Sequence, residues 1–94
     1  EAAQAAEPGN PVVVANFGQI ALRQNRLPLA IEQFRMALSV DPGLLQARFE
    51  LARALARSGD RQGAVKEAEV LLSQLPAGAP QRPEVERLLA ALRQ

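Results

Sequence analysis

The chain has 94 residues, of which 48% are hydrophobic and only three are aromatic, all of them phenylalanine. Eleven basic and ten acidic side chains give a net charge of +1, which provides no general attraction to nucleic acid or anionic membranes. The chain has no cysteine for a disulfide, no apolar run near the roughly 20 residues that span a bilayer, and few β-branched residues, so one small all-α domain is expected.

Residues 1–10 are rich in Ala, Glu and Gln and contain the dipeptide Pro8-Gly9. Because Pro-Gly interrupts a helix and chain ends are poorly anchored, we interpret this stretch as a flexible N-terminal tail or linker. An ordered N-terminal helix is the alternative. Glu1 stands first without a preceding Met, which predicts a cut domain or a processed form.

The first helix is predicted over 11–24, because Asn10 is a good N-cap and Pro11 suits the first helical position. The second is predicted over 28–40, and Asp41-Pro42 ends it, since a residue before proline disfavours helix. Helical spacing predicts the inward residues of the first helix to be Val14, Phe17, Gly18 and Ala21. Those of the second are Ala30, Ile31, Phe34, Ala37 and Leu38.

A third helix is predicted over 44–58 and a fourth over 61–74, separated by Gly59 and the N-cap residue Asp60. A short fifth helix is predicted over 84–93, after a proline-rich connection. The inward residues of the third helix are expected to be Ala47, Leu51, Ala52 and Leu55. Those of the fourth are Ala64, Val65, Ala68, Leu71 and Leu72, and those of the fifth are Val85, Leu88, Leu89 and Leu92.

The two halves of the chain repeat with a period of 34 residues. This shift places Ala30 on Ala64, Leu38 on Leu72, Pro42 on Pro76, Arg23 on Arg57, and Asn25 on Gly59. A helical repeat of this length resembles the tetratricopeptide repeat, although Ala21 stands where an aromatic residue is usual. The resemblance implies an all-α, right-handed superhelix of antiparallel helix hairpins with five helices. It divides the chain into repeats 11–44 and 45–78 and a capping helix at about 83–93.

The inventory of catalytic side chains is small. The chain has no His, Cys, Thr or Tyr, and its hydroxyl groups belong to three serines near predicted helix C-termini. The carboxylates of Glu67 and Glu69, and of Glu84 and Glu86, are two residues apart and therefore lie on different helix faces. The sequence thus predicts no enzyme, no catalytic residue, no metal site and no cofactor.

The resemblance implies instead a protein–protein interaction scaffold, whose first helices line a concave groove that binds a peptide or a partner segment. The residues expected in this groove are Asn16, Gln19, Arg23, Gln46, Phe49, Glu50, Arg53, Arg57 and Arg87, with Ala15 and Leu22 on the same side of the first helix. Arginines at these positions would hold the carboxylates of an acidic or C-terminal segment, and Phe49 would be an apolar anchor. The alternative is that the arginines are solvated, or pair with glutamates for less than about 1 kcal/mol each.

Some family members hold a chaperone's C-terminus with a clamp of Lys, Asn and Arg. This chain differs at the corresponding positions, so the resemblance does not extend to that activity; the residues there are Ala15, Gln19, Glu50, Pro80 and Glu84.

Three further features bear on the partner, on an alternative function and on the source of the chain. Val12–Val14 cannot all face one neighbour within one helical turn, so at least one of these valines is expected to be exposed. It is either an ordinary exposed side chain, or it is covered by upstream sequence or by a second copy of the chain. A homodimer or a structural segment that uses this end is therefore an alternative function. The segments 71–76 and 85–92 are similar to the C-terminal repeats of bacterial c-type cytochrome assembly proteins, which hold apocytochrome C-termini. The excess of Arg over Lys, with abundant Ala, indicates a GC-rich bacterial genome and leaves cytoplasm and periplasm open as compartments.

Overall fold

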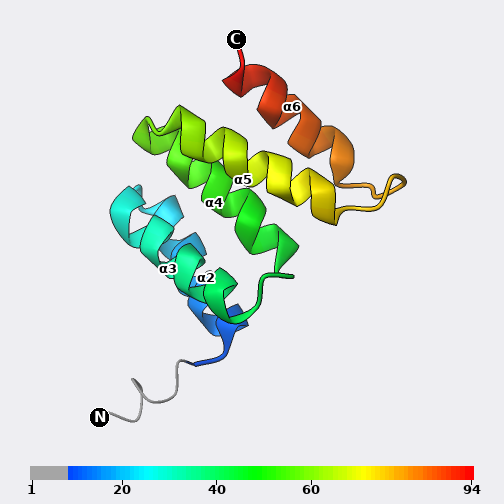
Figure 1. Ribbon diagram of the computed structural model, residues 1–94. Coiled ribbons are helices and arrows are strands. Elements are labelled where there is room, and N and C mark those ends of the chain that lie inside the picture. The colour runs from blue at the N-terminus through cyan, green and yellow to red at the C-terminus, as the bar shows by residue number, and fades with distance from the viewer. Residues whose placement is uncertain (1–8) are drawn as a thin grey trace.

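The computed structural model describes residues 9–94, which fold into five α-helices and contain no strand (Figure 1). The all-α class expected from the sequence is therefore confirmed, and every predicted helix boundary lies within two residues of the observed one. The predicted flexible tail falls largely on residues 1–8, which lie outside the described residues. The helices are α2 (Pro11–Arg23), α3 (Leu27–Val40), α4 (Leu45–Ser58), α5 (Arg61–Gln74) and α6 (Arg82–Leu92).

The helices pack in chain order, α2 on α3, α3 on α4, α4 on α5 and α5 on α6 (Figure 1). Tight turns join α2 to α3 and α4 to α5 as antiparallel hairpins, because Asn25 and Gly59 adopt the left-handed conformation with φ of 60° and 96°. α6 follows the second hairpin as a single helix. The result is an elongated stack of 45 × 28 × 19 Å, with α2 at one end and α6 at the other.

Two helices begin at side-chain caps that the sequence predicted. The Asn10 Oδ1 atom accepts a hydrogen bond from the Val12 amide at 2.8 Å. In the same way, the Asp60 Oδ1 atom accepts one from the Gly63 amide at 2.9 Å. Each cap satisfies a backbone N–H that the first helical turn leaves without a partner, so these two helix starts are fixed by local chemistry.

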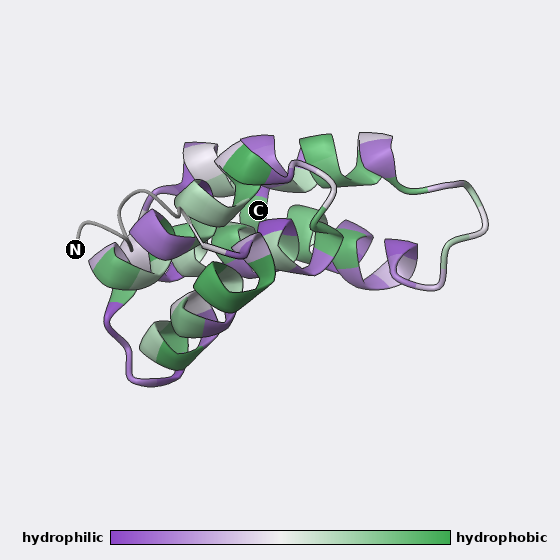
Figure 2. Ribbon diagram, turned by 90° about the horizontal axis from the view of Figure 1, so that it is seen from below, coloured by the Kyte–Doolittle hydropathy of each residue, from purple (hydrophilic) through white to green (hydrophobic). Residues whose placement is uncertain are grey.

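α3 and α6 start one and two residues earlier than the sequence predicted. α3 begins at Leu27 and includes Pro28 at once, and α6 begins at Arg82 and includes Pro83. Proline is tolerated there because the first-turn N–H groups have no acceptor within the helix. The connection before α6 projects at the edge of the molecule in both views (Figures 1 and 2).

Small residues let α2 and α3 approach each other around Phe34. The Phe34 side chain is completely buried, as are Ala30 and Ala37 on the same face of α3. A Cβ atom added to Gly18 would lie only 2.9 Å from carbon atoms of the Phe34 ring. Gly18 therefore makes room for the ring, and Ala30, Phe34 and Ala37 face inward as the sequence predicted.

The buried residues form two clusters, and α4 contributes to both. The first cluster joins α2, α3 and α4 and includes Ala64 of α5 and Leu92 of α6, and Phe34 and Leu51 are its largest fully buried side chains. The second joins α4, α5 and α6 and consists of Ala52, Ala68, Leu71, Leu75, Val85 and Leu89. Every inward residue predicted on α4 is buried, while Val65, Leu72 and Leu88 on α5 and α6 are only partly buried.

The predicted inward stripe of the first helix is wrong at Phe17. The Phe17 side chain is 58% exposed, whereas Ala15 and Leu22, expected on the groove side, are buried. Helical periodicity identifies which residues share a face, but the neighbours that cover the face depend on the array. In the described part of the chain α2 packs chiefly on α3, and the face that carries Phe17 is left open.

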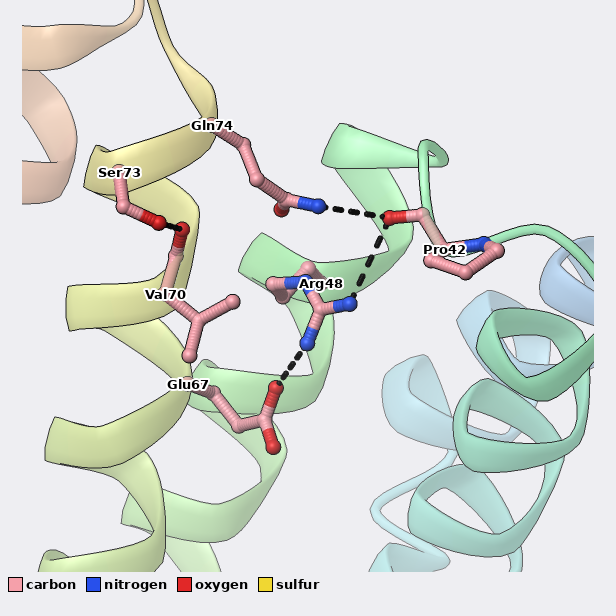
Figure 3. A network of polar contacts seen from close by, with 6 residues as sticks. All are labelled: Pro42, Arg48, Glu67, Val70, Ser73 and Gln74. Carbon is pink, nitrogen blue, oxygen red and sulfur yellow. Dashed lines mark hydrogen bonds and ion pairs between the residues drawn. The ribbon is translucent and has the colours of Figure 1, made fainter.

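A polar network fastens the turn between the two hairpins to α5 (Figure 3). Arg48 Nη1 donates to Glu67 Oε1 at 2.7 Å, and these side chains are only 12% and 19% exposed. The Pro42 carbonyl oxygen accepts hydrogen bonds from Arg48 Nη2 at 3.4 Å and from Gln74 Nε2 at 3.0 Å. The network therefore links α4, α5 and the α3–α4 turn, and holds the second hairpin against the end of the first.

Each helix carries both hydrophilic and hydrophobic residues, as the colouring of Figure 2 shows. Such amphipathic helices bury one face against their neighbours and leave the other in water. Among residues 9–94, no helix combines the length and the hydropathy that crossing a membrane requires.

Candidate functional site

A polar pocket lies between α2 and α4. Each of the two helices contributes three residues, and the spacing of these residues along the chain places them on one face of their helix. The pocket is lined by Gln19, Leu22, Arg23, Glu50, Arg53 and Arg57. Five of these six belong to the groove expected from the sequence, and the structure brings them together.

This pocket has an excess of positive charge. Its lining contains three arginines and one carboxylate, that of Glu50. Glu50 is engaged on both oxygens, since Oε2 accepts from Gln46 Nε2 at 3.0 Å and Oε1 lies 3.9 Å from Arg53 Nη1. Within residues 9–94, neither Arg23 nor Arg57 forms an ion pair, and these guanidinium groups keep their capacity to bind an anionic group.

Arg57 also connects the two hairpins. Its Nη1 atom donates to the Leu22 carbonyl oxygen at 3.5 Å, near the C-terminus of α2. The last carbonyl groups of a helix have no N–H donor within the helix and attract positive charge. The Leu22 carbonyl also accepts a hydrogen bond from the Asn25 amide at 3.0 Å, so it has partners both in the turn and on α4.

A second, narrower pocket lies beside the first, between α4, the end of α5 and the start of α6. Its walls include Leu71 and Val85, which are almost completely buried, and its rim carries Gln46, Gln81 and Glu84. Its full lining is Leu45, Gln46, Phe49, Leu71, Leu75, Gln81, Glu84 and Val85. An apolar floor with a polar rim is suited to one apolar side chain of a bound segment.

Phe49 and Arg53 link the two pockets along α4. Phe49 lines the apolar pocket, and the central guanidinium carbon of Arg53, which lines the polar one, lies 5.9 Å from the centroid of the Phe49 ring. This is the distance range of a cation–π contact, which at exposed sites is worth about 0.5–1 kcal/mol. The two pockets therefore form one continuous surface, called here the α4 surface.

Two of the residues expected in the groove line neither pocket. Asn16 and Arg87 are exposed on α2 and α6, respectively. Conversely, the sequence did not single out Leu45, Leu75 and Gln81, which line the apolar pocket. Leu75 and Gln81 lie in the connection between helices, where no periodicity indicates their direction.

The serine hydroxyl groups serve the helices that carry them. Ser39, Ser58 and Ser73 each donate to the backbone carbonyl three residues earlier, at 2.7, 2.8 and 2.6 Å. In the described part of the chain, no group of three or more acidic, histidine or cysteine side chains is placed to hold a metal ion.

Comparison with known families gives one match. The family model described as tetratricopeptide repeat matches residues 21–92, which include the second half of the first hairpin, the whole second hairpin and α6. No curated protein matches the chain.

Proposed function

This chain belongs to the tetratricopeptide repeat family, and we propose that it binds an acidic or C-terminal segment of a protein partner along the α4 surface. Domains of this family generally mediate protein–protein interaction and are typically not catalytic. In the same proposal, residues 11–44 and 45–78 are the two repeats, and α6 is the helix that caps them.

The observation that carries the proposal is the cluster of Arg23, Arg53 and Arg57 around one pocket, beside the apolar pocket of Phe49. A guanidinium group offers two parallel N–H donors that match the two oxygens of a carboxylate. An apolar side chain next to such a carboxylate would enter the second pocket and displace water from Leu71 and Val85. The preferred ligand therefore carries acidic and apolar residues close together in an extended segment.

A library of fluorescent peptides tests this proposal. It combines acidic and neutral sequences with free and amidated C-termini, so that side-chain and terminal carboxylates are separated. We expect the acidic peptides to bind the wild type, and the double variant Arg53→Glu/Arg57→Glu to lower their affinity at least about tenfold, measured by anisotropy. Peptides of an apocytochrome C-terminus belong in the same library, because that partner is the narrower alternative.

The matched control is Arg26→Glu/Arg35→Glu, which makes the same change in net charge at exposed arginines outside both pockets. Equal losses in the two double variants would show a general charge effect and contradict the proposed site. Arg87→Glu alone measures whether the exposed arginine of α6 contributes, as the sequence predicted. Circular dichroism of each variant checks that the fold is retained.

Self-association is the alternative function, and one observation favours it. Val12 and Val13 are 50% and 47% exposed near the start of α2. If the chain dimerises through these valines, sedimentation of the wild type will show a dimer that Val13→Glu dissociates. A wild-type monomer removes this alternative and leaves peptide binding unaffected.

A further inference from the structure

Three side chains form a row along α4. Phe49, Arg53 and Arg57 follow one another at intervals of four residues, so they lie on one side of the helix at successive turns. With a rise of about 1.5 Å per residue, neighbouring members of the row are about 6 Å apart along the helix axis, and the two ends are about 12 Å apart. The distance of 5.9 Å between the Arg53 guanidinium carbon and the Phe49 ring fits this interval. The row therefore offers one apolar contact and two cationic contacts at equal intervals.

An extended segment presents its side chains at matching intervals. Each residue of such a segment advances by about 3.3 Å, and successive side chains point to opposite sides. Alternate residues therefore share one side, at about 6.6 and 13 Å from the first. A side chain that enters the apolar pocket beside Phe49 would bring the residue two positions along to Arg53 and the residue four positions along to Arg57. Residues one and three positions along would point away from the row.

The apolar pocket is suited to one uncharged side chain. Its cavity of about 80 Å³ is about half of the roughly 150 Å³ that encloses a benzene molecule, so it has room for the end of one aliphatic side chain. Among the described residues that line it, Glu84 alone is charged, and this carboxylate forms no ion pair with any of residues 9–94. A carboxylate at this point would meet a like charge, which disfavours acidic residues there.

The two cationic contacts differ in how much of their charge is already balanced. Arg53 lies over the Phe49 ring and 3.9 Å from a carboxylate oxygen of Glu50. Arg57 lines the polar pocket together with Arg23, and in the part of the chain that the structure describes neither of these two arginines forms an ion pair. A carboxylate that reaches Arg57 would therefore lie near two guanidinium groups, and it should bind more strongly than one that reaches Arg53.

From these intervals and charges we propose that the partner segment binds in an extended form and carries an aliphatic residue and a carboxylate four positions apart. A second carboxylate, two positions from the aliphatic residue, adds less. This inference rests on the proposed function and adds to it the spacing of the ligand's side chains. The segment can run along α4 in either direction, because side chains alternate in the same way in both.

A series of peptides with blocked termini tests the spacing. Each contains one leucine and one aspartate in a background of serine and glycine, with the aspartate one, two, three, four or seven positions from the leucine and on either side of it. Chemical-shift titration of the ¹⁵N-labelled protein measures the affinities, which allows weak binding to be compared. In one of the two directions, we expect the peptide with a separation of four to bind at least about fivefold more tightly than those with one or three, and the peptide with two to lie between them.

Two variants assign this preference to the row. Arg57→Gln should abolish the advantage of a separation of four over a separation of three. The matched control is Arg35→Gln, which removes the same charge at an exposed arginine outside both pockets and should keep that advantage.

The separation of seven distinguishes an extended ligand from a helical one. In a helix, residues seven positions apart share one face and are about 10.5 Å apart, so tighter binding at seven than at four overturns the inference. Equal binding at three and four also overturns it, and so does a series that does not bind although acidic peptides of the library described above do. In these cases the proposed function still holds. If no acidic peptide of either set binds, the proposed function fails and the inference fails with it.

Discussion

Phe34 is the side chain on which the contact between α2 and α3 depends most. It is completely buried and lies against the backbone of Gly18, where even a methyl group would come within 2.9 Å of the ring. With only three aromatic residues in the chain, no other aromatic side chain is available to fill that space. The small and large residues at this crossing are therefore complementary, and neither can change size without a loss of packing.

We predict that Phe34→Ala lowers the free energy of unfolding by about 3–5 kcal/mol, because it removes a fully buried ring and leaves a cavity beside Gly18. Urea denaturation followed by circular dichroism measures the loss. Met36→Ala on the same helix is the control, since Met36 is 46% exposed and should lose less than about 1 kcal/mol. Similar losses in the two variants would mean that Phe34 is not the residue that fills the crossing.

At the scale of helices, the sequence could predict where each element begins and ends. The signals are local: Asn10 and Asp60 bind amides two and three residues ahead, and Asn25 and Gly59 turn the chain within one residue. Such chemistry needs no knowledge of distant parts of the fold. The repeat register likewise predicted that Gln19, Arg23 and the arginines of α4 share a side, and they line one pocket.

Contacts between helices could not be predicted in the same way. Phe17 and Leu51 are equivalent in the repeat, yet Phe17 is exposed and Leu51 is buried. The reason is that α4 packs against the helix that precedes it, α3, whereas α2 is the first helix in the described residues. The apolar pocket takes Leu75 and Gln81 from a connection that has no periodicity. The pairing of Arg48 with Glu67 spans 19 residues, and it depends on the angle at which α4 meets α5.

That pairing gives a prediction for the second hairpin. Arg48→Ala leaves Glu67 largely buried without its partner, and we expect a loss of about 2–3 kcal/mol in the free energy of unfolding. The control is Arg82→Ala, because the pair of Arg82 with Glu86 is longer, at 3.7 Å, and its glutamate is 56% exposed. Double-mutant cycles in urea measure both couplings.

The coupling between Arg82 and Glu86 should be below about 1 kcal/mol, as for other exposed ion pairs. Arg82 also donates to the carbonyl oxygens of Leu72 and Leu75, so its single variant loses more than this coupling alone. The cycle separates the two contributions, since the carbonyl contacts do not involve Glu86. A coupling for Arg48 with Glu67 as small as that of the exposed pair would contradict the structural role given to the network.

For the whole molecule, the order of packing determines how stability is distributed. α4 has α3 on one side and α5 on the other, and it contributes to both buried clusters. α2 and α6 stand at the two ends, and each packs chiefly on one helix within the described residues. In stacks of this kind, stability is approximately a sum of contributions from each unit and from the contacts between neighbours.

Hydrogen exchange measured by mass spectrometry should reveal this gradient. We predict that amides of α4 exchange most slowly, and that those of α2 and α6 exchange at least about tenfold faster, because the end helices open without disturbing the centre. Uniform protection across α2–α6 would show instead that the stack unfolds as one cooperative unit.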